Sequence, residues 1–538
     1  MKARFRVWVL LSLILVIGLA GCTSKTPEKA SEASSASGAP KDELILAVGG
    51  EPDAGFDPTT GWGRYGSPLF QSTLLKRDHD MKVVYDLATG YELNADGTAW
   101  TVKLRKDAKF SDGKNVTSAD VQYTFDTAAR SGSAIDLSNL KSMETPDEYT
   151  IKFNLKEPQS TFVQTLVATG IVPKHAHGKD YASKPIGSGP YKLVQWDKGQ
   201  QAIVEANPEY YGSKPVFKKL TFLFLNEDAA YATAKAGKVD ISYIPAAFSK
   251  QPVAGMRIET AHSVDNRGIM FPYVKAGGKT KEGYPVGNDV TAELSIRKAI
   301  NIALDRKAIV QGVLEGQGTP AYTVNDGLPW FNPESVIKDA DMEGAKKLLE
   351  EDGWKDTDGD GIREKGGLKA QFNLLYPASD VTRQSLSIAA ADMLKPLGIQ
   401  VKAEGKSWDE LEKLMHANPV MLGWGSHDPL EMYNVYSAKY QGVEYYNPGY
   451  YSNDTVEDYM NKALRATNEK DALEFWKKAQ WDGKTGLSAK GDAAWAWLVN
   501  INHLYLVKDG LDIGKQMIHP HGHGWPVTSN IEEWRWTK

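Results

Sequence analysis

Short apolar runs and alternating runs recur along most of the chain and predict β-strands. Residues 44–48 read Leu-Ile-Leu-Ala-Val and end at Gly49-Gly50, which is typical of a buried strand closed by a turn. Residues 100–105 and 150–155 alternate apolar and polar side chains, as half-buried antiparallel strands do. Further strands are expected at 219–225, 239–241 and 370–375.

Apolar side chains at helical spacing predict helices between these strands. Residues 117–120 form a capping sequence ahead of a helix that continues to Ala128. A long amphipathic helix is expected from Leu294 to Leu314. Shorter helices are expected at 228–236, 342–349 and 385–394. Because strands and helices interleave and no repeat of about 20–50 residues is visible, the sequence predicts mixed α/β lobes.

The first 42 residues follow a different pattern. Lys2, Arg4 and Arg6 precede an almost unbroken apolar run over residues 7–19, which is too short for a helix that must span about 30 Å of bilayer. An export signal is therefore favoured over the alternative, a permanent membrane anchor. The polar tract 23–41 has too few apolar side chains to fold by itself and is expected to be a tether.

Cys22 is the only cysteine, which excludes intramolecular disulfides and any metal site that needs two thiolates. Residues 19–22, Leu-Ala-Gly-Cys, resemble the bacterial lipoprotein box, in which cleavage precedes the cysteine and its thiol carries diacylglycerol. The alternative is a buried free thiol. The resemblance implies a signal peptide over 1–21, a lipidated Cys22 with a tether to residue 42, and a body held at the outer face of the membrane.

Length, charge and motifs narrow the function classes. The chain has 538 residues, which at about 100–200 residues per domain leaves room for three domains or two large lobes. Its 63 basic and 68 acidic residues are scattered, which argues against nucleic acid as the main partner because phosphate binding needs a concentrated basic surface. The sequence contains no phosphate-cradling loop, nucleophile elbow or zinc-protease helix, so we do not expect an enzyme. A secreted or surface hydrolase with an aromatic-lined cleft, working through a carboxylate pair, is the alternative.

Five segments, in order, resemble the peptide and nickel class of solute-binding proteins that serve bacterial ABC importers. These segments are 87–113, 185–191, 207–211, 297–306 and 423–429. The resemblance implies a monomeric, extracytoplasmic receptor that captures a short peptide or a peptide-like nickel chelate and delivers it to an ABC permease. It implies no resident cofactor, with nickel or another transition metal entering only as part of the ligand.

The resemblance also implies an α/β fold of two lobes, the large peptide-binding type II class of periplasmic binding proteins, with a small subdomain inserted in lobe I. The chain would cross between the lobes near His262 and Asn502, which would form the hinge. The expected boundaries are 43–258 for lobe I, about 72–175 for the inserted subdomain, 266–499 for lobe II and 503–538 for a C-terminal segment returning to lobe I.

Two short segments carry candidate ligand-binding residues. Trp62, Arg64 and Tyr65 follow a Pro/Gly-rich stretch and are expected on a loop, where Arg64 would clamp a ligand carboxylate between aromatic walls. The alternative is that Asp57 or Asp53 neutralises Arg64.

The second segment contains Trp424, His427 and Asp428. The resemblance implies that Asp428 receives the α-ammonium of a peptide, with Trp424 as a wall. His427 departs from the family's pattern, which leads us to expect a tyrosine or another residue there, and its imidazole could ligate a metal. The alternative for Asp428 is a turn opening, because Asp followed by Pro is common in turns.

Two polar clusters suggest metal binding. His519, His521 and His523 alternate in a Gly/Pro-containing loop and could present neutral nitrogens to nickel, copper or zinc; a solvated turn is the alternative. Residues 356–361, Asp-Thr-Asp-Gly-Asp-Gly, look like the first half of a calcium loop. The twelfth position is Gly367 rather than Glu, so a polar turn is the favoured interpretation. The choice between peptide and nickel chelate stays open, with a slight preference for peptide.

Overall fold

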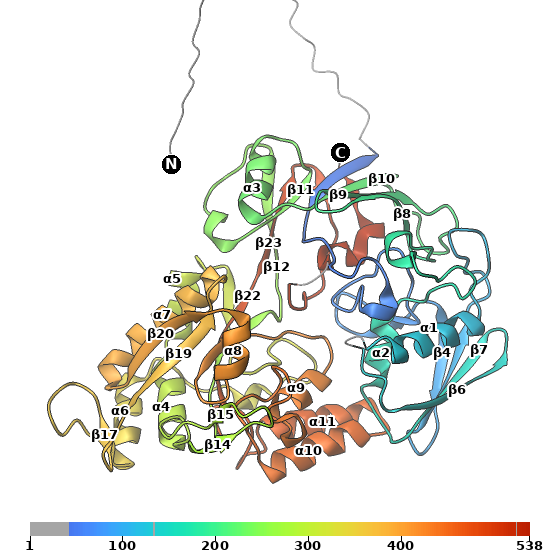
Figure 1. The fold of residues 1–538 in the computed structure, drawn as a ribbon. Coiled ribbons are helices and arrows are strands. Elements are labelled where there is room, and N and C mark those ends of the chain that lie inside the picture. The colour runs from blue at the N-terminus through green and yellow to red at the C-terminus, as the bar shows by residue number, and fades with distance from the viewer. Residues whose placement is uncertain (1–41, 133–134, 523–524, 538) are drawn as a thin grey trace, which may run out of the picture. The chain divides into compact units, whose positions relative to one another are not determined.

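The computed structural model describes residues 42–132, 135–522 and 525–537 (Figure 1). The described residues form one compact unit. The predicted signal peptide, the lipidation site and almost all of the tether lie outside the described residues. Within the described ranges, no helix has the length and apolar character needed to cross a bilayer.

A seven-stranded mixed sheet organises the part of the chain that we name the first lobe. β1 lies at its centre and pairs in parallel with β10 and β11, while the remaining pairs are antiparallel. In spatial order the strands are β12 (Met256–Ala261), β23 (His503–Lys508), β11 (Ile241–Ile244), β1 (Glu43–Ala47), β10 (Lys219–Leu223), β9 (Gln201–Ala206) and β8 (Tyr191–Asp197). Helix α3 (Glu227–Lys235) packs on β11. Trp525 from the C-terminal segment stacks on Phe222 of β10 with ring centres 4.1 Å apart, which ties that segment to this lobe.

A four-stranded antiparallel sheet belongs to the same lobe and lies at the right of Figure 1. Its spatial order is β4 (Ala88–Leu93), β5 (Ala99–Leu104), β7 (Thr150–Leu155) and β6 (Leu140–Asp147). Helices α1 (Ser118–Arg130) and α2 (Phe162–Ala168) cover it, and Trp100, Phe125, Phe153 and Phe162 share its core. The predicted capping sequence begins α1, because Thr117 and Asp120 form a reciprocal capping box.

A six-stranded sheet organises the second lobe, at the lower left of Figure 1. Its spatial order is β16 (Gly318–Pro320), β22 (Trp495–Ile501), β13 (Asn266–Met270), β21 (Val420–Leu422), β19 (Gln371–Pro377) and β20 (Gln400–Lys406). The helices of this lobe are α4 (Leu294–Ala303), α5 (Arg306–Val313), α6 (Met342–Glu351), α7 (Val381–Leu394), α8 (Trp408–Leu414), α9 (Leu430–Tyr436), α10 (Asp454–Arg465) and α11 (Glu469–Gln480).

Short elements complete the described chain. The two-stranded ribbons are β2 (Leu75–Arg77) with β3 (Val83–Tyr85), β14 (Gly278–Lys279) with β15 (Pro285–Val286), β17 (Glu364–Lys365) with β18 (Leu368–Lys369), and β24 (Leu511–Asp512) with β25 (Arg535–Trp536). The 3-10 helices are η1 (Pro58–Thr60), η2 (Tyr181–Ser183), η3 (Ala246–Phe248), η4 (Pro333–Ser335), η5 (Lys395–Leu397), η6 (Ala438–Tyr440) and η7 (Pro526–Glu533).

The single long helix expected from Leu294 to Leu314 is two helices, so that prediction was wrong. Leu304 is extended, with φ −64° and ψ 130°, and ends α4. The Asp305 side chain then accepts a hydrogen bond from the Ala308 N–H and begins α5. Apolar side chains keep their helical spacing across the break, so the spacing alone does not reveal it. The capping residue Asp305 does mark it.

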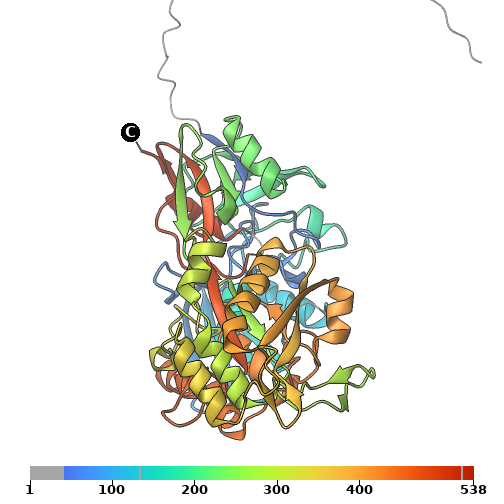
Figure 2. The same cartoon turned by 90° about the vertical axis from the view of Figure 1, so that its left-hand side faces the viewer.

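The two sheets are joined by adjacent connections. Residues 262–265 link β12 to β13, and Asn502 links β22 to β23. In Figure 2 the orange-red chain of β22 and β23 continues from one sheet into the other. His262 Nδ1 lies 3.2 Å from Asn502 Oδ1, which places the connections side by side. That these segments act as a hinge stays a prediction.

Candidate ligand-binding site

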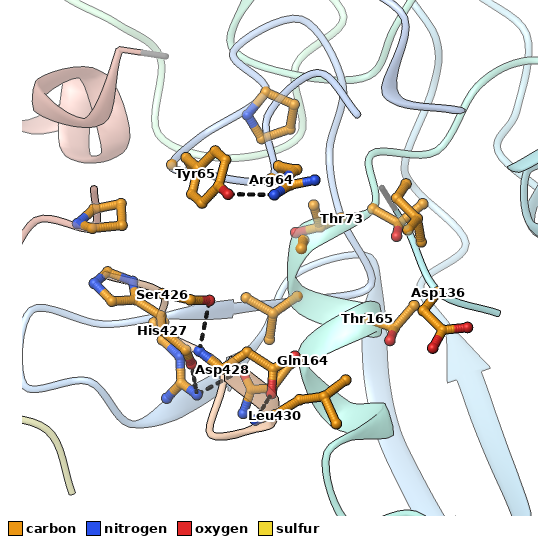
Figure 3. A pocket seen from close by; sticks show the side chains of 18 of the residues that line it. Arg64, Tyr65, Thr73, Asp136, Gln164, Thr165, Ser426, His427, Asp428 and Leu430 are labelled. Atoms are coloured by element: carbon orange, nitrogen blue, oxygen red, sulfur yellow. Dashed lines mark hydrogen bonds between the residues drawn. The ribbon is translucent and has the colours of Figure 1, made fainter. Parts of the chain in front are cut away.

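A cavity of about 870 Å³ is lined by both lobes (Figure 3). The first lobe contributes the loop 64–68, β2 and α2, and the second lobe contributes residues 424–434 and 440–446. This volume lies within the usual range of small-molecule sites. The cavity is therefore the candidate ligand-binding site.

Arg64 and Tyr65 enter the cavity from the loop that follows η1 (Figure 3). The Arg64 guanidinium donates a hydrogen bond to the Tyr65 hydroxyl, and Cζ lies 4.3 Å from the Tyr65 ring centre. Asp57 instead faces His177, at 3.0 Å between Oδ2 and Nε2. Among the described residues Arg64 has no ion-pair partner, so its charge is available to an anionic ligand group.

Trp62 is not among the residues that line this cavity. Its side chain belongs to the core of the first lobe, where it makes edge-to-face contacts with Phe56 at 5.0 Å and Trp525 at 5.2 Å. Its indole N–H donates to the Pro68 carbonyl at 2.7 Å. The large apolar ring is more stable when packed against other aromatic rings than when exposed in a cleft. Trp62 therefore anchors the loop that carries Arg64 to the core of the first lobe.

Hydrogen bonds from side chains to the local backbone fix the second-lobe segment 424–431. Glu431 on α9 accepts from the N–H groups of Gly425 and Ser426 at 3.1 and 3.0 Å, and Asp428 Oδ1 accepts from the Leu430 N–H at 2.9 Å. Gly425 has φ +149°, and a Cβ at this position would lie 2.5 Å from the Val264 carbonyl oxygen. Only glycine fits this close approach. The segment thus holds Asp428 and Glu431 at the cavity wall.

Burial changes the charge state of these two carboxyl groups. It raises the pKa of Asp428 to about 7, although the Leu430 N–H and the charge of Arg77 act in the opposite direction. Burial likewise raises the pKa of Glu431 to about 7, against the two backbone N–H groups that it accepts. A cationic ligand group would favour the ionised forms of both.

Arg77, at the end of β2, is a cavity residue that the sequence analysis missed. Its Nη2 donates to Gln164 Oε1 on α2 at 2.6 Å and to the His427 carbonyl at 3.3 Å, so it connects the two lobes. Its Nε is buried and has no hydrogen-bond partner in the described structure. Burial lowers the pKa of Arg77, and the Asp428 charge opposes this. Glu431 was also missed, although its place three residues after Asp428 at a helix start was a usable signal.

Trp424 and His427 form part of the second-lobe wall. Trp424 stacks on Tyr446 with ring centres 5.5 Å apart. Burial, together with the charge of Arg77, lowers the pKa of His427 to about 3, so the imidazole is neutral. Trp424 Nε1 and His427 Nε2 are buried without a hydrogen-bond partner among the described residues, which leaves both nitrogens available to a ligand.

The described C-terminal histidines face other side chains. His519 is fully buried, with Nδ1 3.1 Å from His503 Nδ1 and Nε2 3.3 Å from Gln516 Oε1. His521 Nδ1 bonds to a carboxylate oxygen of Asp265. His523 lies outside the described residues, so a three-histidine metal site stays a prediction. Over the described ranges, His519 and His521 belong to no group of three or more metal-ligating side chains.

Comparisons with known proteins agree with this architecture. The profile of bacterial extracellular solute-binding proteins, family 5 Middle, matches residues 82–447. Protein XP55 of Streptomyces lividans is 32% identical over 492 residues, which cover 88% of this chain and 86% of that protein. The oligopeptide-binding protein AppA of Bacillus subtilis is 30% identical over 508 residues, 87% of this chain and 90% of AppA.

Solved structures show the same fold. AppA of Bacillus subtilis in complex with a nonapeptide has a TM-score of 0.68 and 26% identity, covering 92% of this chain and 99% of that one. NikZ of Campylobacter jejuni in complex with Ni(L-His) has a TM-score of 0.75 and 24% identity, covering 92% and 100%, and shows the fold alone. The predicted two-lobe α/β fold is confirmed.

Proposed function

The chain belongs to family 5 of the bacterial extracellular solute-binding proteins, and on this premise we propose that it captures a short peptide between its lobes and delivers it to an ABC permease. Family 5 proteins serve ABC importers and bind peptides or nickel chelates. The chain is therefore a binding protein and not an enzyme, which excludes the hydrolase alternative.

The distribution of charge over the cavity carries the choice of a peptide. Arg64 stands on the first-lobe side without an ion-pair partner among the described residues, and Asp428 stands on the second-lobe side (Figure 3). Glu431 also lines the cavity from the second lobe. A peptide backbone ends in an ammonium and a carboxylate, so it has a partner on each side. The role of Asp428 as the ammonium acceptor follows the resemblance to peptide-binding relatives.

The same wall offers little to a nickel chelate. Among the described residues that line the cavity, His427 supplies the one imidazole, and it belongs to no cluster of metal-ligating groups. A chelate that arrives with its own ligands could use this single nitrogen. Peptide is therefore the preferred ligand.

Calorimetry with ligand-free protein tests this choice. We expect di- to nonapeptides with free termini to bind with Kd values of about 1 μM, or −8 kcal/mol, and nickel with two equivalents of histidine to give no heat at millimolar concentration. The protein is first unfolded and refolded to remove peptides retained from the cell. Binding of the nickel complex combined with no binding of any peptide would contradict the proposal and favour the chelate.

Lipidation of Cys22 is a separate part of the proposal and rests on the sequence of the leader. In cells fed labelled palmitate, the wild-type protein is expected to carry the label and to begin at Cys22. The Cys22→Ala variant is expected to carry no label and to retain residues 1–21, because the lipid acceptor is lost. Ser24→Ala is the matched control and keeps the label. An unlabelled wild-type protein would exclude the anchor.

A further inference from the structure

Four acidic side chains converge outside the ligand cavity, in the second lobe. The three aspartates lie on the segment that connects α6 to the β17–β18 hairpin, and the glutamate begins β17, at the left of Figure 1. Asp356, Asp358, Asp360 and Glu364 each offer a carboxylate oxygen, and these oxygens all lie within 4.8 Å of one another. None of the four lines the cavity. Their convergence is thus separate from the proposed peptide site.

The backbone wraps around this cluster. Asp356 Oδ1 accepts from the Gly359 N–H at 2.8 Å, and its Oδ2 accepts from the Gly361 N–H at 3.0 Å. Gly359 and Gly361 have φ values of +79° and +86°, a conformation that glycine adopts readily. Asp360 Oδ1 accepts from the Ile362 N–H at 2.9 Å. These bonds orient the acidic side chains without neutralising their charge.

Glu364 is the most buried member of the cluster, and its Oε1 has only a 3.7 Å ion pair with the Lys369 ammonium and no hydrogen bond from a described residue. Its side chain is 10% exposed, and its Oε2 accepts from the N–H and the hydroxyl of Thr357, both at 2.9 Å. Its Oε1 is buried and has no hydrogen-bond partner in the described structure. A buried carboxylate oxygen without a hydrogen-bond donor is unfavourable, and a cation in direct contact with it would stabilise it more than an ammonium at 3.7 Å.

Glu364 also supplies a carboxylate that the sequence pattern of a calcium loop lacks at Gly367. The sequence places Gly367 where a calcium loop has its bidentate Glu, but the fold returns Glu364, nine positions into the loop, to the three aspartates. Counting along an extended loop could not show this, because the β17–β18 hairpin sets the position of Glu364.

Lys369 on β18 is the competing cation. Its Nζ lies 3.0 Å from Asp358 Oδ2, contacts Asp360 Oδ2, and lies 3.7 Å from Glu364 Oε1. Its side chain is 34% exposed, so the ammonium can turn into solvent. One positive charge against four negative charges leaves a large excess of negative charge in the cluster.

We propose that Asp356, Asp358, Asp360 and Glu364 bind one Ca²⁺ ion, with Lys369 displaced into solvent. Carboxylate oxygens prefer hard cations such as Ca²⁺ over nickel or zinc. Ca²⁺ takes six to eight oxygen ligands in flexible geometry, whereas Mg²⁺ keeps several waters and binds one or two carboxylates. Four carboxylate oxygens that all lie within 4.8 Å of one another therefore fit Ca²⁺ better than Mg²⁺. The ion would hold the segment between α6 and β17 against the start of the β17–β18 hairpin.

Calorimetry on chelator-treated, folded protein tests this site. Titration with CaCl₂ is expected to give one site with a Kd of about 0.1–1 mM, the range of extracellular calcium modules, and at least tenfold weaker binding of MgCl₂. Glu364→Gln should weaken Ca²⁺ binding at least tenfold, because the amide keeps the shape but loses the charge. Glu343→Gln, at a side chain 84% exposed on α6, is the matched control and should leave the affinity unchanged.

Lys369→Met is a second variant with the opposite expected effect. It should bind Ca²⁺ about tenfold more tightly once the competing ammonium is removed, and a misfolded protein could not give this result. Circular dichroism confirms that each variant is folded. Absence of Ca²⁺ binding by the wild-type protein at 10 mM would overturn the proposal even if Lys369→Met binds, since Lys369 would then be the permanent cation. Unchanged affinity in Glu364→Gln would overturn it as well. Peptide affinity should not respond to Ca²⁺, so this result and the peptide proposal fail independently.

Discussion

Replacing Arg306 by methionine is expected to lower the free energy of unfolding by about 3–5 kcal/mol, the usual effect of removing one partner of a buried ion pair. Arg306 begins α5 and is fully buried. Its Nε donates to the carbonyls of Ala321 and Trp497 at 2.9 and 2.7 Å, and its Nη2 donates to Asn301 Oδ1 at 2.8 Å. Nη1 pairs with Asp339 Oδ2 at 3.2 Å. Methionine fills similar space but leaves these acceptors without donors.

Urea unfolding monitored by circular dichroism measures this effect. Lys347→Met, at a side chain 77% exposed on α6, is the matched control and should change stability by less than about 0.5 kcal/mol. Arg306→Lys should fall between the two, because it keeps the charge but cannot make the forked set of hydrogen bonds. A loss below about 1 kcal/mol in Arg306→Met would show that the surrounding carbonyls find other donors, contrary to this interpretation.

Much of the fold could be predicted because local pattern and tertiary structure agree. The apolar run at 44–48 coincides with β1, and the alternating runs at 100–105 and 150–155 coincide with β5 and β7. In each case the period of apolar side chains reflects one buried sheet face, which is a local property. Capping at Thr117 is local in the same sense.

The buried arginines show what such patterns leave out. The segment 297–306 resembled the family, yet its charged side chains gave no sign that they are buried. Arg297 is 2% exposed and donates to the carbonyls of Thr291 and Ala292 at 2.7 and 2.8 Å. Arg306 is likewise buried and donates to backbone carbonyls. A charged residue in an amphipathic pattern is read as solvent-facing, and only tertiary packing reveals the carbonyls that receive it.

The candidate site was predictable where it depends on single segments. Arg64, Tyr65, Trp424, His427 and Asp428 all line one cavity. Arg77 was missed because its contact with the His427 carbonyl spans 350 positions of sequence, and no local pattern encodes it. Trp62 shows the converse limit, since an aromatic residue beside a loop has the same sequence pattern whether it faces the cavity or the core.

Asp428→Asn is expected to weaken the binding of peptides with a free amino terminus by about 30-fold to several thousand-fold, or 2–5 kcal/mol. The carboxylate stands in the cavity with one backbone donor, the Leu430 N–H at 2.9 Å, and is proposed to pair with the peptide ammonium. Asparagine keeps the acceptor for Leu430 and removes the charge, so the segment should keep its shape.

The ligand offers a matched control for this substitution. Acetylating the peptide amino terminus removes the same ion pair from the other side, so it should greatly weaken binding to the wild-type protein. Acetylation should then have little further effect on Asp428→Asn, because coupled partners are not additive. Equal losses from acetylation in both proteins would contradict the assigned role of Asp428. Glu343→Gln, outside the cavity, should bind both peptides like the wild type.

The pH dependence of peptide affinity follows from the raised pKa values in the cavity. The pKa of Asp428 and that of Glu431 lie at about 7 in the ligand-free protein, so both carboxyl groups become neutral as the pH falls below that value. An ammonium binds the ionised form, and affinity should therefore fall below pH 7 by up to about tenfold per pH unit for each carboxyl group that must lose its proton. Above pH 8 it should fall again, because a peptide amine with a pKa of about 8 loses its charge.

Calorimetry in buffers of different ionisation enthalpy should detect proton release on binding at pH 6.5, and acetylated peptides should lose this release. A flat affinity profile from pH 5.5 to 7.5 would exclude these carboxyls as the ammonium site.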